Sequence, residues 1–132
     1  FFPTPPRPPP ILSGLVGSEM CIRDRHRIPI VQFLQEQAAE SLQHAQTAGE
    51  FLTGLDGHPS QKISDIVETH DHTIKGILEE SLEHEVFALN LYKKLLPIVE
   101  DSSIYLEEYT RNLIGQEEQH QLELRKMLKD FS

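Results

Sequence analysis

The chain has 132 residues, enough for one domain, and its formal net charge of −9 argues against nucleic acid, because phosphate binding needs clustered Lys and Arg. No apolar run approaches the roughly 18 residues of a membrane span, so we expect no membrane partner. The single cysteine, Cys21, excludes an intramolecular disulfide and fits a reducing compartment, so we expect a cytoplasmic protein.

Residues 1–25 differ in kind from the rest of the chain. Six of the nine prolines fall in the first ten residues, and the segment has neither helical periodicity nor the ordered features of a secretory signal. One interpretation is a disordered Pro-rich tail or a polyproline II ligand. We prefer another, because the string LVGSEMCIRDR resembles translated sequencing-adapter sequence. We therefore predict that residues 1–25 are foreign and that the domain proper spans 26–132.

The first predicted helix covers residues 30–54, with Pro29 in its first turn. Gly54, Gly57 and Pro59 are expected to end it.

The second predicted helix reaches Pro97, and the third follows an N-cap at Ser103 and runs to the C-terminus. Ser64 is a candidate cap for the second helix, but we place its start near Asp71 and treat 55–70 as a connection. No strand pattern competes, so the sequence predicts an all-α fold.

Two acidic residues occupy the centres of apolar helical stripes. At about 100° per residue, both Glu85 and Glu117 have leucines above and below them on the same face. Antiparallel helices joined near residue 100 bring the two acids to the same height, about 20–25 Å from the turn. The neighbouring Glu79, Glu80 and Glu83 are expected to face solvent.

His120 lies three residues after Glu117 and points to the same side of the helix. Two facing carboxylates in an apolar core repel each other and stay partly protonated unless a cation neutralises them. A Glu-x-x-His pair aimed inward is half of a bundle-type di-metal site. Glu85, Glu117 and His120 are therefore predicted metal ligands.

The first helix offers Glu40 and His44, an i, i+4 pair on one side of that helix, as further ligands. For His44 to reach the level of Glu85, the first two helices must run parallel. Extended over about 50 Å, the connection 55–70 is long enough for this crossover. Of the other histidines, His70 and His72 are expected to be exposed and His58 to lie in a loop, whereas His84 is expected at a helix–helix seam.

Residues 26–132 resemble the ferritin-like superfamily, in particular its bacterioferritin-related branch. The resemblance rests on Glu85-x-x-Ala88-x-x-x-Tyr92, on Glu117-x-x-His120 and on the second-helix motif that ends at His44. It implies a four-helix bundle with a long crossover, in which Glu85 and Glu117 ligate iron, His44 and His120 each bind one metal, and Glu40 bridges. Tyr92 would hydrogen-bond a ligand.

The chain departs from the family pattern in three ways. The residue three before His44 is Ser41, so the bridging acid would be Glu40, one position early. Leu42 stands where bacterioferritins carry a haem-binding Met, so no haem is expected. The first bundle helix and its Glu are expected to be missing, leaving a bundle truncated to three long helices, with an exposed apolar groove and impaired activity. Glu19 and Asp24 are not expected to supply the missing acid.

The predicted function is that of a di-iron protein that oxidises Fe(II) with O₂ or peroxide, a ferroxidase, with iron storage as an accompanying role and a homo-oligomeric state. Mn(II) also suits these ligands. One alternative is a di-iron or di-manganese oxidase, oxygenase or peroxidase of the rubrerythrin or manganese-catalase type. The other is a metal-free helical interaction module, in which Glu85 and Glu117 would face solvent or a partner.

Overall fold

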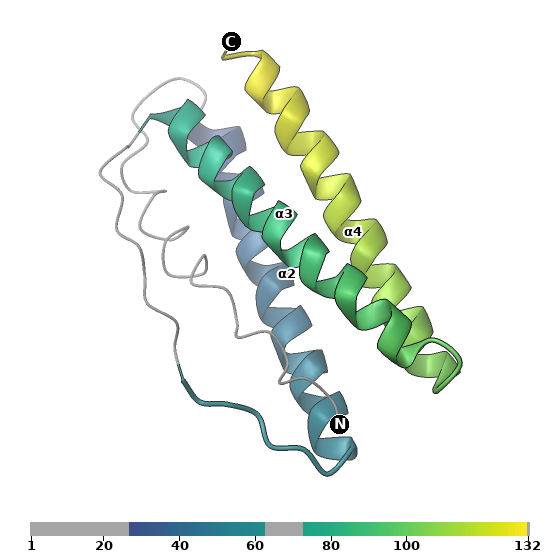
Figure 1. Ribbon diagram of the computed structural model, residues 1–132. Coiled ribbons are helices and arrows are strands. Elements are labelled where there is room, and N and C mark those ends of the chain that lie inside the picture. Colours follow the sequence, from purple (N-terminus) through teal and green to yellow (C-terminus); the bar gives the residue numbers. More distant parts are fainter. Residues whose placement is uncertain (1–26, 63–72, 132) are drawn as a thin grey trace. The chain divides into compact units, whose positions relative to one another are not determined.

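The computed structural model describes residues 27–62 and 73–131, which belong to two separate units (Figure 1). The regular structure in these ranges consists of the helices α2 (Arg27–Gly54), α3 (Ile74–Val99) and α4 (Ile104–Lys129). No strand occurs among the described residues, which confirms the all-α prediction. The predicted foreign segment 1–25, with Glu19 and Asp24, lies outside the described ranges. None of these three helices is both long and apolar enough to cross a membrane.

Helix α2 begins at Arg27, three residues before the predicted start, so Pro29 is its third residue. The first four N–H groups of a helix have no intrahelical partner, and the missing proline N–H therefore costs little there. The helix ends at Gly54, as predicted.

The C-terminus of α2 is closed by backbone hydrogen bonds around a left-handed residue. Asp56 has φ 59°, and the Gly57 N–H donates to the Leu52 carbonyl at 2.8 Å. A Cβ on Gly57 would lie 2.9 Å from that same carbonyl oxygen, so glycine is needed there for close approach. The left-handed position itself is taken by Asp56 and not by a glycine.

Helix α3 begins at Ile74, three residues after the predicted start near Asp71. Thr73 is its N-cap, because its hydroxyl accepts a hydrogen bond from the Gly76 N–H at 3.0 Å. Asp71 and the alternative cap Ser64 lie outside the described residues, as does the second half of the predicted connection, 63–70. The helix passes through Pro97 and ends two residues later.

A tight turn joins α3 to α4. The Glu100 N–H donates to the Leu96 carbonyl at 2.9 Å, and Asp101 adopts a left-handed φ of 61°. Ser103 has extended backbone and accepts from the Leu106 N–H at 3.4 Å, which confirms it as the N-cap of α4. Because this connection is short, α3 and α4 are antiparallel neighbours (Figure 1).

The hairpin of α3 and α4 buries matched apolar residues along its length. Leu78 and Leu124 are fully buried at one end, and Leu89 and Leu113 are buried nearer the turn. These pairs lie at equal distances in sequence from residue 101, as expected for antiparallel helices. Between the two leucine levels lie Glu85 and Glu117, also equidistant from the turn. The predicted exposure of Glu79, Glu80 and Glu83 is confirmed.

Helix α2 buries Ile30, Leu34 and Gln37. Since α2 belongs to the other unit, the parallel crossover between the first two predicted helices stays a prediction.

The left-handed Asp101 generates a stability prediction. Asp101→Val should lower the free energy of unfolding by about 1–2 kcal/mol, because a β-branched side chain collides with the backbone at positive φ. Asp101→Gly, which accepts this conformation, is the control. Equal midpoints in thermal unfolding for the two variants would contradict the role of the turn.

Candidate metal centre

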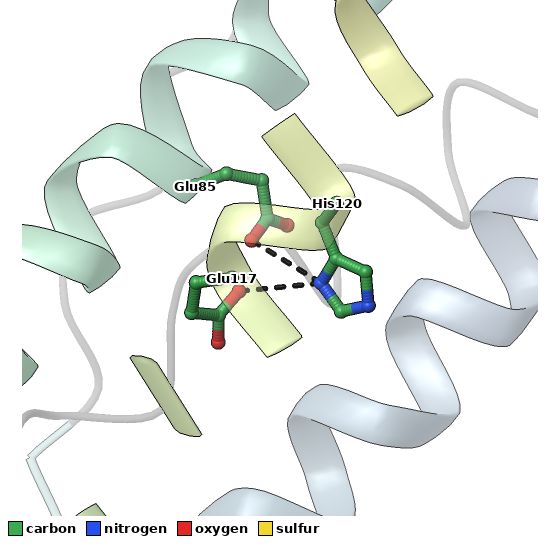
Figure 2. A group of neighbouring side chains, drawn as sticks. All are labelled: Glu85, Glu117 and His120. Carbon is green, nitrogen blue, oxygen red and sulfur yellow. Dashed lines mark hydrogen bonds and ion pairs between the residues drawn. The ribbon is translucent and has the colours of Figure 1, made fainter. Parts of the chain in front are cut away.

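Three of the five predicted ligands come together between α3 and α4. Glu85 extends from α3, and Glu117 and His120 extend from positions about one turn apart on α4 (Figure 2). Their exposed fractions are 6 %, 5 % and 9 %, so all three side chains are buried. The sequence prediction that the two acids meet in the interior, with His120 on the same side, is confirmed.

The imidazole faces both carboxylates from one side, and its Nδ1 is directed toward them (Figure 2). His120 Nδ1 lies 3.3 Å from Glu117 Oε2 and 3.6 Å from Glu85 Oε2. One ligand atom from each residue lies within 4.8 Å of the other two. Two oxygen donors and one nitrogen donor thus surround a volume small enough for one cation to contact all three.

The electrostatics of this group are those of two carboxylates buried close together beside one imidazole. The pKa of Glu117 is raised from 4.5 to about 7, chiefly by burial and also by the hydrogen bond and Coulomb repulsion with Glu85, while His120 opposes the rise. Glu117 therefore keeps its proton to a higher pH than an exposed glutamate does. A divalent cation would replace that proton and satisfy the same oxygens.

The donor set fits a divalent transition metal. Mixed carboxylate and imidazole ligation suits Fe(II) or Mn(II) and does not exclude Zn(II). The residues present therefore match the chemistry that the sequence predicted.

Two half-buried tyrosines of the α3–α4 hairpin have raised pKa values. Burial, followed by the charges of Glu117, Tyr109 and Glu85, raises the pKa of Tyr92. Burial raises the pKa of Tyr109 to about 12. Both phenols therefore stay protonated at neutral pH and able to donate. The predicted hydrogen bond from Tyr92 to a ligand stays a prediction, and the sequence analysis did not single out Tyr109.

His84 is half-buried on α3. Burial lowers its pKa, and the negative charge of Glu117 partly opposes that shift. The imidazole is therefore held toward its neutral form. His58 lies in the irregular segment after α2, as predicted, and is exposed, whereas His70 and His72 lie outside the described residues.

Gln121 is a buried polar neighbour that the sequence analysis missed. Its side-chain Nε2 donates to the backbone carbonyl of Glu85 at 3.3 Å, and its exposed fraction is 6 %. The signal was present in the sequence, because Gln121 lies about 40° from Glu117 on the buried face. A glutamine there needs a partner as much as a glutamate does.

The remaining predicted ligands, Glu40 and His44, lie one turn apart on α2, and both are half-buried. Their shared side of the helix agrees with the prediction. Their approach to Glu85, Glu117 and His120, and the bridging role of Glu40, stay predictions because α2 lies in the other unit.

The raised pKa of Glu117 sets the pH dependence of the metal-free protein. The folded state holds a proton that the unfolded state releases near pH 4.5, so this stabilisation is complete below pH 4.5 and is lost as pH rises through about 7. Glu117→Gln, which cannot titrate, should flatten this part of the profile. The free energy of unfolding is measured by chemical unfolding in the presence of chelator from pH 4 to 8. An equal dependence on pH in the unchanged protein and in Glu117→Gln would refute the raised pKa of Glu117.

Comparison with known proteins identifies the fold and the family of the chain. The chain resembles a ferritin-like, diiron-carboxylate protein from Bacillus anthracis str. Ames in structure, with a TM-score of 0.75 and 18% identity over 90% of each chain. At that identity the likeness shows a shared fold. No curated protein matches the sequence. The family model described as the ferritin-like domain matches residues 16–132, starting within the predicted foreign segment. The chain therefore belongs to the ferritin-like domain family.

Proposed function

We propose that this protein is a ferroxidase, a di-iron protein that binds Fe(II) and oxidises it with O₂ or peroxide. The observation that carries the proposal is the buried convergence of Glu85, Glu117 and His120, with ligand atoms within 4.8 Å of one another. The similar diiron-carboxylate protein from Bacillus anthracis str. Ames supports it as a relative in fold. When bound, the iron pair would supply the electrons for reducing the oxidant.

The chain's own residues would hold and tune this site. Glu85 and Glu117 would provide the negative charge that balances the metal, and Glu117 would release its proton as metal binds. His120 Nδ1 lies closest to both carboxylates and would be the nitrogen donor. Glu40 and His44 on α2 would complete the set for a second ion.

The donor set also favours a second candidate, a di-iron or di-manganese oxidase or peroxidase that acts on another substrate. Fe(II) oxidation without an added organic substrate would separate the two functions. A metal-free interaction module is disfavoured, because burying two carboxylates that repel each other is costly without a cation.

Iron storage and self-association belong to the same proposal. Exposed Phe87 on α3, together with Ile104 and Tyr105 at the start of α4, supports contact with further copies of the chain. Cage-sized particles that accumulate many irons per chain would indicate storage.

The single cysteine fits a reducing compartment, and we propose the cytoplasm as the location of the protein.

Replacing a central ligand tests the proposed activity. Glu117→Ala should lower metal affinity by more than the roughly 10–100-fold that follows loss of a supporting hydrogen bond, because it removes a charged ligand. Fe(II) oxidation should fall with it. Glu83→Ala, at an exposed position on α3, is the matched control and should leave both unchanged. Equal oxidation rates for the two variants would mean that the site lies elsewhere.

A double variant tests the contribution of α2. Glu40→Ala combined with His44→Ala should reduce the metal bound per chain from two ions to one, because Glu85, Glu117 and His120 would still hold the first. Anaerobic Fe(II) titration gives the stoichiometry. Two ions bound by the double variant would remove Glu40 and His44 from the ligand set.

A further inference from the structure

The side chain of Gln121 links α4 to α3 at the metal centre itself. Its Nε2 donates to the backbone carbonyl of Glu85 at 3.3 Å, so it contacts the main chain of the residue that supplies the α3 carboxylate. On α4 it directly follows His120 and lies one turn beyond Glu117. One side chain therefore connects the backbone positions of all three converging residues.

This link is built into the interior and is not a surface contact. Gln121 is 6 % exposed, and a buried primary amide is costly unless its donors and acceptor have partners. The Glu85 carbonyl can accept it in addition to the helix's own ladder, because a carbonyl oxygen has two lone pairs. Methionine or leucine would fill such a position without any polar requirement.

Arg125 holds the Gln121 amide in this orientation. Its Nη2 donates to Gln121 Oε1 at 3.3 Å, so the amide oxygen is directed toward the guanidinium and the amide nitrogen toward Glu85. A flipped amide would set a donor against a donor and an acceptor against an acceptor. Because Arg125 itself is exposed, the orientation is fixed from the surface.

We infer that Gln121 is a positioning residue that sets the height of Glu85 relative to Glu117 and His120, with Arg125 fixing its amide. The inference rests on the proposed metal-binding function. Apolar layers tolerate small slides of one helix along another, whereas a hydrogen bond to one particular carbonyl does not. A displacement of about 1 Å is enough to disturb the geometry of a ligand set.

The test uses Co²⁺ as probe, because its visible absorption reports the number and geometry of its ligands. Gln121→Met keeps the side-chain volume and removes the donor. It should lower Co²⁺ affinity by roughly tenfold, as losses of supporting hydrogen bonds do, and change the absorption spectrum of the bound ion. Gln119→Met on the exposed face of the same helix is the matched control and should leave both unchanged.

The outcomes separate this inference from the proposed function. Wild-type affinity and spectrum in Gln121→Met, even with a lower unfolding temperature, would overturn the positioning role and leave the metal centre standing. No Co²⁺ binding by the unchanged chain would overturn the metal centre and this inference with it. If Gln121→Met does not fold, Arg125→Met decides: its spectrum should shift in the same direction, and an unchanged spectrum would overturn the inference.

Discussion

The constraint on which this structure depends is the burial of two carboxylates that face each other across α3 and α4. Glu85 and Glu117 cost free energy as neighbours in an apolar interior, and the pKa of about 7 at Glu117 records that cost. His120 reduces the cost without removing it. A folded chain that keeps such a pair gives up stability in the metal-free state and gains it back when a cation binds.

The rest of the hairpin holds these acids at one height. The turn from Glu100 to Ser103 fixes where α4 starts, and a left-handed Asp101 keeps it short. The buried leucines on either side of the acids keep the helices in contact, but leucine contacts are not directional. Gln121 adds a directional contact at the level of the site. The register of the two helices is therefore set at the turn and again beside the buried carboxylates.

Periodicity predicted Glu85, Glu117 and His120 because a charged residue at the centre of an apolar stripe is conspicuous and the turn fixes its height. Periodicity does not identify Gln121 in the same way, because an uncharged amide on an apolar stripe is less unusual than a carboxylate. Its partner is also a backbone carbonyl, which a pattern of side chains does not reveal. Apolar spacing predicts a start of α3 near Asp71, three residues early, because it does not show which hydroxyl caps the helix. Glu40 and His44 depend on a crossover that sequence spacing permits but does not determine.

Neighbouring residues of α4, His120 and Gln121, make two different kinds of contact. From Glu117, His120 is rotated by about 60° in one direction and Gln121 by about 40° in the other, so the two side chains flank the carboxylate. His120 Nδ1 turns toward both acids, whereas Gln121 reaches past them to the α3 backbone. If His120 and Gln121 exchanged places, the imidazole would face the backbone carbonyl of Glu85 and the amide would face the two carboxylates. The Glu-x-x-His spacing alone therefore does not specify the site. The residue after the histidine also contributes, because its hydrogen bond to Glu85 helps to set the position of α3 along α4.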